Sequence, residues 1–191
     1  MLESLSQDLQ HRPVRLVDVL RAKFPKTKSV PFDRLCECLP SLQPRYYSIA
    51  SDPMSHVDGS LEIFVRLIKG GVASQHLASH PHHVYGFIRK SSFHLPKGRN
   101  KPILMIGPGT GIAPLLGFLH RRSAQMRKQQ RSGSVQDNGP VWLFHGCRLR
   151  EHYTHRIEGL VEAHVDSNAL QHLFVCFSRE ETPRGTADRR Y

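Results

Sequence analysis

The stretch PILMIGPGTGIAP, residues 102–114, decides how the second half of the chain folds. Its first five residues form a short apolar run, typical of a parallel strand buried on both faces. Gly107, Gly109 and Gly111 follow, and a helical pattern then covers residues 113–130. Glycines between a strand and a helix let the backbone donate N–H groups to a pyrophosphate, although a tight turn without a ligand explains them equally well. The spacing is not G-x-G-x-x-G, so a standard Rossmann dehydrogenase is not the best match.

Strand and helix patterns alternate after this glycine loop. The polar stretch at 131–140 breaks the helix, and VWLFHG at 141–146 is another buried strand. A helical pattern at 151–164 and the apolar strand LFVCFS at 173–178 follow. The order strand, helix, strand, helix, strand predicts a doubly wound α/β domain over residues 99–191.

The first hundred residues have a different organisation. Apolar residues at helical spacing in 1–44 predict a helical connecting region. Residues 45–98 combine alternating apolar segments with tight turns and a short helical pattern at 72–80, and they predict part of a small β-barrel. The expected strands of that barrel are residues 45–50, 61–68, 84–88 and 93–95.

Composition excludes several classes of protein. The 191 residues carry 27 Lys plus Arg against 16 Asp plus Glu, a net charge of +11, which indicates anionic partners. The basic residues are not interleaved with aromatic ones, so no nucleic acid is expected. No apolar run reaches the ~18 to 20 residues of a membrane span and no signal pattern begins the chain, so we expect a cytoplasmic protein. No metal is expected, because His76, His80, His82 and His83 lack cysteine or carboxylate partners at ligand spacing.

Two further motifs suit a nucleotide cofactor. RYYS at 45–48 places an arginine beside paired tyrosines, which can hold a pyrophosphate and stack on a planar ring such as a flavin. An edge strand with cross-strand aromatic pairs explains the same residues. GVAS at 71–74 opens a helical pattern whose N–H groups can face an anion, but an ordinary loop and helix would look the same.

Taken together, the motifs resemble the ferredoxin-NADP reductase module of the diflavin reductases. RYYSIAS, GGVAS, RKSSFHLP, PILMIGPGTGIAPLLGFLHRR, WLFHGCR and FVCFSRE occur in the order and spacing of that family. Within it the chain most resembles the methionine synthase reductase branch, through LQPR, SFHLP and WLF-x-GCR. RYYSIAS, FIRKS and FSRE resemble the NADPH-cytochrome reductase branch at least as well. The resemblance implies a partial FAD-binding barrel followed by a truncated NADPH-binding α/β domain.

The resemblance also implies FAD and NADPH as cofactors and a role for each matching residue. Ser48 is expected to act catalytically, with its hydroxyl near the reactive flavin nitrogen. The remaining expected cofactor contacts are Arg45, Tyr46, Tyr47 and Ser48 for FAD; Gly71, Val72, Ala73 and Ser74 for its pyrophosphate; Gly109, Thr110 and Gly111 for the NADPH pyrophosphate; Cys147 and Arg148 as a second nicotinamide-nucleotide contact; Ser178 and Arg179 for the 2′-phosphate; Arg189 as a further cation; and Tyr191 against adenine.

The activity implied is that of an NADPH-dependent flavoprotein oxidoreductase. Hydride passes from NADPH to FAD, and electrons continue through FMN in a domain outside this chain to cobalamin-bound methionine synthase. Electron transfer of the NADPH-cytochrome reductase type and a catalytically incomplete nucleotide-binding fragment are the alternatives. Two residues depart from the family pattern: His76 replaces a usual tryptophan, and His145 replaces the aromatic residue before GCR. The chain also stops before the family's Cys-Gly-Asp segment and its flavin-covering aromatic residue.

Overall fold

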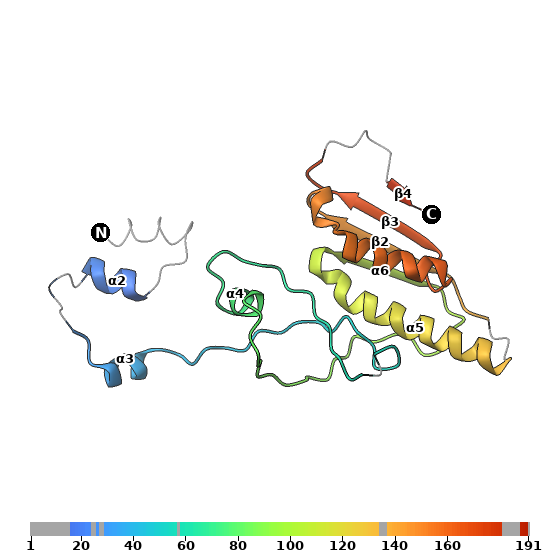
Figure 1. Ribbon diagram of the computed structural model, residues 1–191. Coiled ribbons are helices and arrows are strands. Elements are labelled where there is room, and N and C mark those ends of the chain that lie inside the picture. Colours follow the sequence, from blue (N-terminus) through green and yellow to red (C-terminus); the bar gives the residue numbers. More distant parts are fainter. Residues whose placement is uncertain are drawn as a thin grey trace. The chain divides into compact units, whose positions relative to one another are not determined.

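The computed structural model describes residues 16–23, 26, 29–56, 58–133, 137–180 and 188–190. The chain divides into two units, residues 1–44 and 45–191. The first unit contains helices α2 (Leu16–Lys23) and α3 (Phe32–Cys38), drawn in blue in Figure 1. Pro31 precedes α3, and Asp33 in its first turn complements the helix dipole. Both helices lie where apolar residues at helical spacing predicted them.

The second unit contains a four-stranded sheet in the order β1 (Ile103–Pro108), β2 (Val141–Cys147), β3 (His172–Phe177) and β4 (Asp188–Arg190). The first three strands are parallel, and β4 pairs antiparallel with β3. Their crossovers are α5 (Ala113–Ser132) and α6 (His155–Asp166). The predicted alternation of strands and helices from 102 to 178 is therefore confirmed, while β4 was not predicted.

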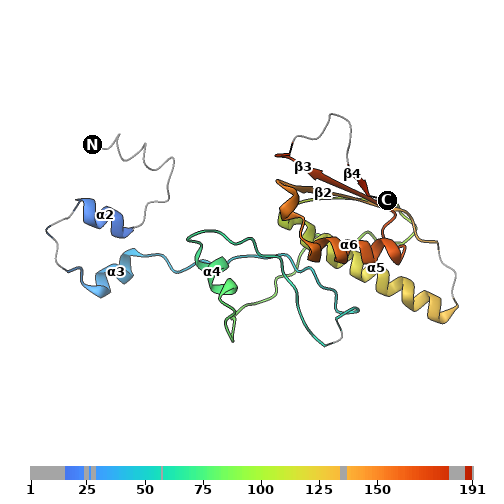
Figure 2. The same ribbon diagram turned by 45° about the horizontal axis from the view of Figure 1, so that its top comes forward.

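One face of this sheet forms the main hydrophobic core. Alternate strand residues such as Met105, Leu143 and Leu173 are buried, and they share a cluster with Leu116 of α5 and Val161 of α6. Figures 1 and 2 show both helices on the same side of the sheet. Two successive right-handed crossovers that advance in one direction leave their helices on one side. In the described residues the sheet is thus covered on a single face, and the doubly wound arrangement is not seen.

The other face of the sheet carries aromatic pairs. Phe144 stacks on Phe174 with ring centroids 4.5 Å apart, and Trp142 stacks on His172 at 5.4 Å. On β1 of the same face, Ile106 is 69% exposed. This side of the sheet is apolar, and no helix in the described part of the chain covers it.

The β-barrel expected for residues 45–98 is not formed in the described residues. Its predicted strands make a single isolated bridge, Ile49 to Ile63, and the one regular element is α4 (Val72–Ala78). A strand pattern states which side chains share a face, but a ladder also needs neighbouring strands as hydrogen-bonding partners. Several apolar residues of this stretch are accordingly exposed, among them Tyr85 at 98% and Phe87 at 68%.

Candidate functional site

The glycine loop lies where β1 meets the first crossover helix. A short 3-10 turn, η1 (Gly109–Ile112), leads directly into α5. A Cβ atom at Gly107 would lie 2.7 Å from Leu115 Cδ1 and 3.0 Å from the Gly111 carbonyl oxygen, and Gly109 has a φ of +54°. Both positions therefore need glycine. A glycine-rich loop that runs into a 20-residue helix can bring backbone N–H groups close to a pyrophosphate, which is the role predicted for Gly109, Thr110 and Gly111.

Two expected nucleotide-binding pairs meet beside this loop. The Ser178 N–H donates to the Cys147 carbonyl oxygen and the Arg179 N–H donates to the Arg148 carbonyl oxygen, both at 2.9 Å. These residues follow β2 and β3, whose carboxyl ends share one edge of the sheet with the end of β1. Arg148 and Arg179 are exposed. The structure thus places two guanidinium-bearing residues at the sheet edge where α/β domains bind ligands.

The last two expected contacts are Arg189 and Tyr191. The backbone of Arg189 belongs to β4 and pairs with Phe174 in the middle of β3, not with the end of that strand. Tyr191 lies outside the described residues.

A buried histidine and cysteine lie beneath the glycine loop. His145 is 1% exposed; its Nδ1 lies 2.7 Å from the Gly107 carbonyl oxygen, and its Nε2 lies 3.1 Å from Cys147 Sγ. Burial lowers the pKa of His145, although the hydrogen bond to Gly107 opposes this, and burial raises the pKa of Cys147. Both groups are therefore neutral at pH 7. Sequence reasoning identified His145 only as a departure from the family pattern.

The expected flavin motif lies in an extended segment. Tyr46 is 63% exposed; the ring of Phe87 meets it edge-on at 6.2 Å, and the Arg89 guanidinium lies 5.7 Å from its centroid. Ser48 is exposed and Tyr47 is half-buried. An accessible tyrosine face beside a cation suits a planar, anionic cofactor such as FAD.

The second expected FAD segment, residues 71–74, forms the start of α4. Val72 is 61% exposed, whereas Ser74 is buried and its hydroxyl accepts a hydrogen bond from the Ile68 N–H at 3.2 Å. A Cβ atom at Gly71 would lie 2.6 Å from Ser74 Oγ. The Ser74 side chain thus closes the turn before α4. Only the backbone N–H groups of residues 71–74 are then available to bind an anion.

The flavin-motif segment continues into a close contact with α5. Gly117 has no side chain, and a Cβ atom there would lie 3.4 to 3.5 Å from the carbonyl oxygens of Ile49, Ala50 and Ser51. Helix α5 therefore begins at the glycine loop and, one turn later, supports the residues that follow RYYS. The only sequence signal for this contact is a glycine in the interior of a helix.

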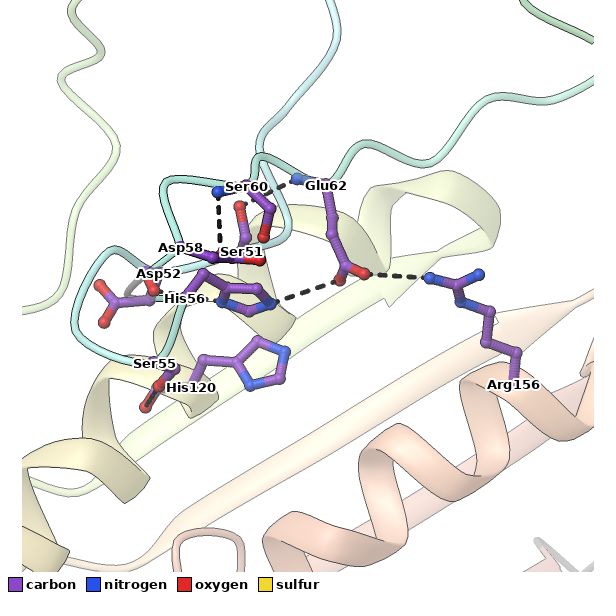
Figure 3. A network of polar contacts seen from close by, with 9 residues as sticks. All are labelled: Ser51, Asp52, Ser55, His56, Asp58, Ser60, Glu62, His120 and Arg156. Carbon is purple, nitrogen blue, oxygen red and sulfur yellow. Dashed lines mark hydrogen bonds and ion pairs between the residues drawn. The ribbon is translucent and has the colours of Figure 1, made fainter. Parts of the chain in front are cut away.

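Polar contacts hold residues 51–62 against the two crossover helices (Figure 3). The buried Asp52 carboxylate accepts a hydrogen bond from Arg121 Nε of α5. Glu62 accepts from Arg156 of α6 at 3.0 Å and also lies 3.8 Å from His56. Two of these ion pairs, Asp52–Arg121 and Glu62–Arg156, connect residues 51–62 to α5 and α6.

Three histidine rings extend this contact inward. His56 meets His120 edge-on at 5.4 Å, and His120 meets His164 at 4.7 Å. Ser123 Oγ lies 2.8 Å from His164 Nδ1. Burial, with the nearby His120 and Arg127, lowers the pKa of His164 to about 4, and burial also lowers the pKa of His120. His120 and His164 are therefore neutral at pH 7.

Comparisons with known proteins identify two domains along the chain. Residues 3–74 match the profile described as FAD binding domain, and residues 105–189 match the oxidoreductase NAD-binding domain. The expected FAD and nicotinamide cofactors are confirmed at the level of these domains. In the described residues, no helix is long and apolar enough to cross a bilayer.

Similar curated proteins are much longer than this chain. NADPH–cytochrome P450 reductase of Homo sapiens is 40% identical over 169 residues, which are 80% of this chain and 24% of that protein. The enzyme of the same name from Rattus norvegicus is 41% identical over 169 residues, 79% of this chain and 24% of the relative. Nitric oxide synthase of Bombyx mori is 35% identical over 185 residues, 90% of this chain and 15% of the relative. The chain spans about a quarter or less of each relative, and it belongs to the diflavin reductase family.

Proposed function

We propose that this chain is the part of an NADPH-dependent flavoprotein oxidoreductase in which NADPH meets FAD. The observation that carries the proposal is the meeting, at one sheet edge, of the glycine loop with the Cys147–Arg148 and Ser178–Arg179 pairs. Backbone N–H groups and arginine guanidinium groups both bind phosphate, and this edge of the sheet has both.

Each nucleotide contact has a distinct task in this proposal. Gly109, Thr110 and Gly111 bind the pyrophosphate of NADPH through their backbone. Arg179 and Ser178 bind the 2′-phosphate, so they select NADPH over NADH, and Cys147 with Arg148 contacts the nicotinamide half. Arg189 adds a cation and Tyr191 packs on adenine, by resemblance alone.

On the flavin side, Arg45 and residues 71–74 hold the FAD pyrophosphate, and Tyr46 and Tyr47 orient the isoalloxazine ring. When bound, FAD accepts a hydride from the nicotinamide of NADPH, which leaves as NADP⁺. By the family resemblance, the Ser48 hydroxyl would lie near the nitrogen that accepts the hydride. The Gly117 contact supports this motif on the same helix that begins at the glycine loop.

The onward path of the electrons is also part of the proposal. We infer an FMN domain as the first acceptor, and beyond it either methionine synthase or a cytochrome P450. The motifs favour the methionine synthase reductase branch, whereas the curated relatives include cytochrome P450 reductases. Reduction assays with the two acceptors, in the presence of an added FMN domain, separate these alternatives.

The first experiment measures flavin binding and reduction. The purified chain, reconstituted with FAD, is mixed with NADPH or NADH in the absence of oxygen. We expect the flavin absorbance near 450 nm to bleach with NADPH and far more slowly with NADH. Retained flavin that neither nucleotide bleaches supports the nucleotide-binding fragment instead, and no uptake of FAD contradicts the flavoprotein assignment.

The second experiment tests the phosphate contact. Arg179→Ala removes an expected fork for the 2′-phosphate, while Arg131→Ala removes an exposed arginine near the end of α5 and serves as the matched control. We expect Arg179→Ala to weaken NADP⁺ binding at least tenfold and to leave NAD⁺ binding unchanged, because charge-assisted hydrogen bonds to phosphate are lost. Equal affinities in both variants contradict the assigned role.

A further inference from the structure

We propose that His145 is a positioning residue that holds the glycine loop in its nucleotide-binding shape through the Gly107 carbonyl group. The inference rests on the proposed binding of NADPH at this loop. His145 touches neither the expected nucleotide contacts Gly109 to Gly111 nor the flavin motif, so its effect passes through the backbone of β1 and through Cys147.

The protonation of the ring follows from its two neighbours. The Gly107 carbonyl oxygen can only accept a hydrogen bond, so Nδ1 at 2.7 Å carries the proton. In a neutral imidazole Nε2 is then an acceptor, and the Cys147 thiol at 3.1 Å donates to it. The ring of Tyr153, with its centroid 5.7 Å away, packs against the same histidine. The imidazole thus has one defined tautomer and one defined orientation.

The hydrogen bond acts at the most crowded point of the loop. Gly107 is the register partner of His145 in the parallel pair of β1 and β2. Its surroundings leave no room for a Cβ atom, since Leu115 and Gly111 lie 2.7 and 3.0 Å from the position of that atom. The peptide plane that His145 holds is the one that leads through Pro108 into Gly109, whose φ is +54°. Rotation of this plane would redirect the N–H groups that follow.

The same ring also connects to the third strand. Cys147, the thiol partner of His145, accepts the Ser178 N–H through its carbonyl oxygen at 2.9 Å. His145 therefore joins the ends of β1 and β2, and through Cys147 it reaches the end of β3. A change at His145 is expected to loosen the pyrophosphate loop and the Cys147–Ser178 contact together.

The test is a matched pair of variants of similar size in the full 191-residue chain. His145→Asn keeps an N–H donor at the same number of bonds from the backbone as Nδ1, and His145→Leu has no donor. His172→Leu, on the open face of β3, is the control. We measure the affinity for NADP⁺ by titration calorimetry, the KM and kcat for NADPH with FAD-reconstituted chain and ferricyanide as the electron acceptor, and the midpoint of thermal unfolding.

We expect His145→Leu to bind NADP⁺ about tenfold more weakly and to raise KM with little change in kcat. His145→Asn is expected to recover most of the affinity, while His172→Leu binds like the wild type. A role in stability alone would lower the unfolding midpoint of both His145 variants without separating their affinities. If His145→Leu does not fold, His145→Phe, which fills the space of the ring, replaces it.

The outcomes separate this inference from the proposed function. Equal NADP⁺ affinity in the donor and non-donor variants, with normal binding by the wild type, overturns the role of His145 and leaves the proposed function intact. Absence of NADP⁺ binding by the folded wild-type chain overturns the proposed function itself. Weakened binding that the Asn variant restores supports both.

Discussion

Residues 103–177 and residues 45–100 belong to the same unit but bury their apolar side chains to very different degrees. In the first stretch Leu116 and Leu143 are 0% exposed, whereas in the second Tyr85 and Ile88 are 98% and 77% exposed. The first stretch obtains its strand partners from neighbouring βαβ units, so its core closes within about 75 residues of chain. The second has apolar side chains but few strand partners. The difference teaches that alternation of apolar residues produces a core only where the topology supplies a covering layer.

The largest effect is expected in the α/β core. Leu116→Ala removes a fully buried side chain between α5 and the sheet and should lower the free energy of unfolding by about 3–4 kcal/mol. Leu67→Ala, at a residue 63% exposed, should change it by less than about 0.5 kcal/mol. Urea unfolding followed by circular dichroism measures both. Similar losses at the two positions would remove the contrast between the regions.

Acid should weaken the packing of α6 against α5, where His164 lies against His120 and Ser123. The folded pKa of His164 is about 4 against an ordinary value of 6.5, so the unfolded chain takes up the proton first as the pH falls. This contribution leaves stability unchanged above pH 6.5 and lowers it by up to about 3 kcal/mol as the pH reaches 4.

Urea unfolding from pH 8 to pH 4 of the wild type and of His164→Gln measures this effect. The variant lacks the titrating group, so its free energy of unfolding does not fall with this protonation. The difference in free energy of unfolding between the wild type and the variant should therefore shrink as the pH falls. A difference that is independent of pH contradicts the lowered pKa of His164.

A methyl group at two glycines provides a third test. At Gly107 a Cβ atom would lie 2.7 Å from Leu115 and 3.0 Å from a backbone oxygen, so Gly107→Ala should destabilise the chain by about 2 kcal/mol. At Gly86, in the exposed stretch, nothing lies within 4 Å of such an atom, and Gly86→Ala should leave the unfolding midpoint within about one degree. Thermal unfolding of the two variants is the measurement; a loss at Gly86 equal to that at Gly107 would show a packed core around residue 86.

The smallest effect concerns a surface ion pair that connects the two regions. Arg156 is 74% exposed at its side chain and Glu62 is 30% exposed. Breaking the pair with Arg156→Ala should lower the free energy of unfolding by about 0.5 kcal/mol at low salt and by less at 0.5 M salt. A double-mutant cycle with Glu62→Gln isolates the interaction energy of the pair. A coupling energy above about 1.5 kcal/mol would show that the pair is not a solvent-exposed surface ion pair.

The α/β order could be predicted because each element has a local signal. Buried strands, the glycine loop and the helix after it are all visible within residues 102–130, and the structure has them there. The barrel could not be predicted from such local signals. The alternation of apolar residues at 61–68 does not show which strands would pair with this one. β4 has only three residues, Asp188–Arg190, with no apolar alternation to identify it.

The candidate site was predictable to a similar extent. The family motifs named Cys147, Arg148, Ser178 and Arg179, and two backbone hydrogen bonds bring these residues together. The bond from His145 to Gly107 joins residues 38 positions apart and depends on the register of two strands. Sequence spacing carries no information on that register, so this contact emerged from the structure alone.

The stack of Trp142 on His172 has a spectroscopic consequence. Trp142 is the single tryptophan of the chain, and it lies on the face of the sheet that carries the aromatic pairs. Its fluorescence therefore reports on that face without interference from any other indole. Covering the face by a further layer of protein should shift the emission to shorter wavelength and shield it from iodide quenching. The chain contains its own optical reporter for whatever packs against the sheet.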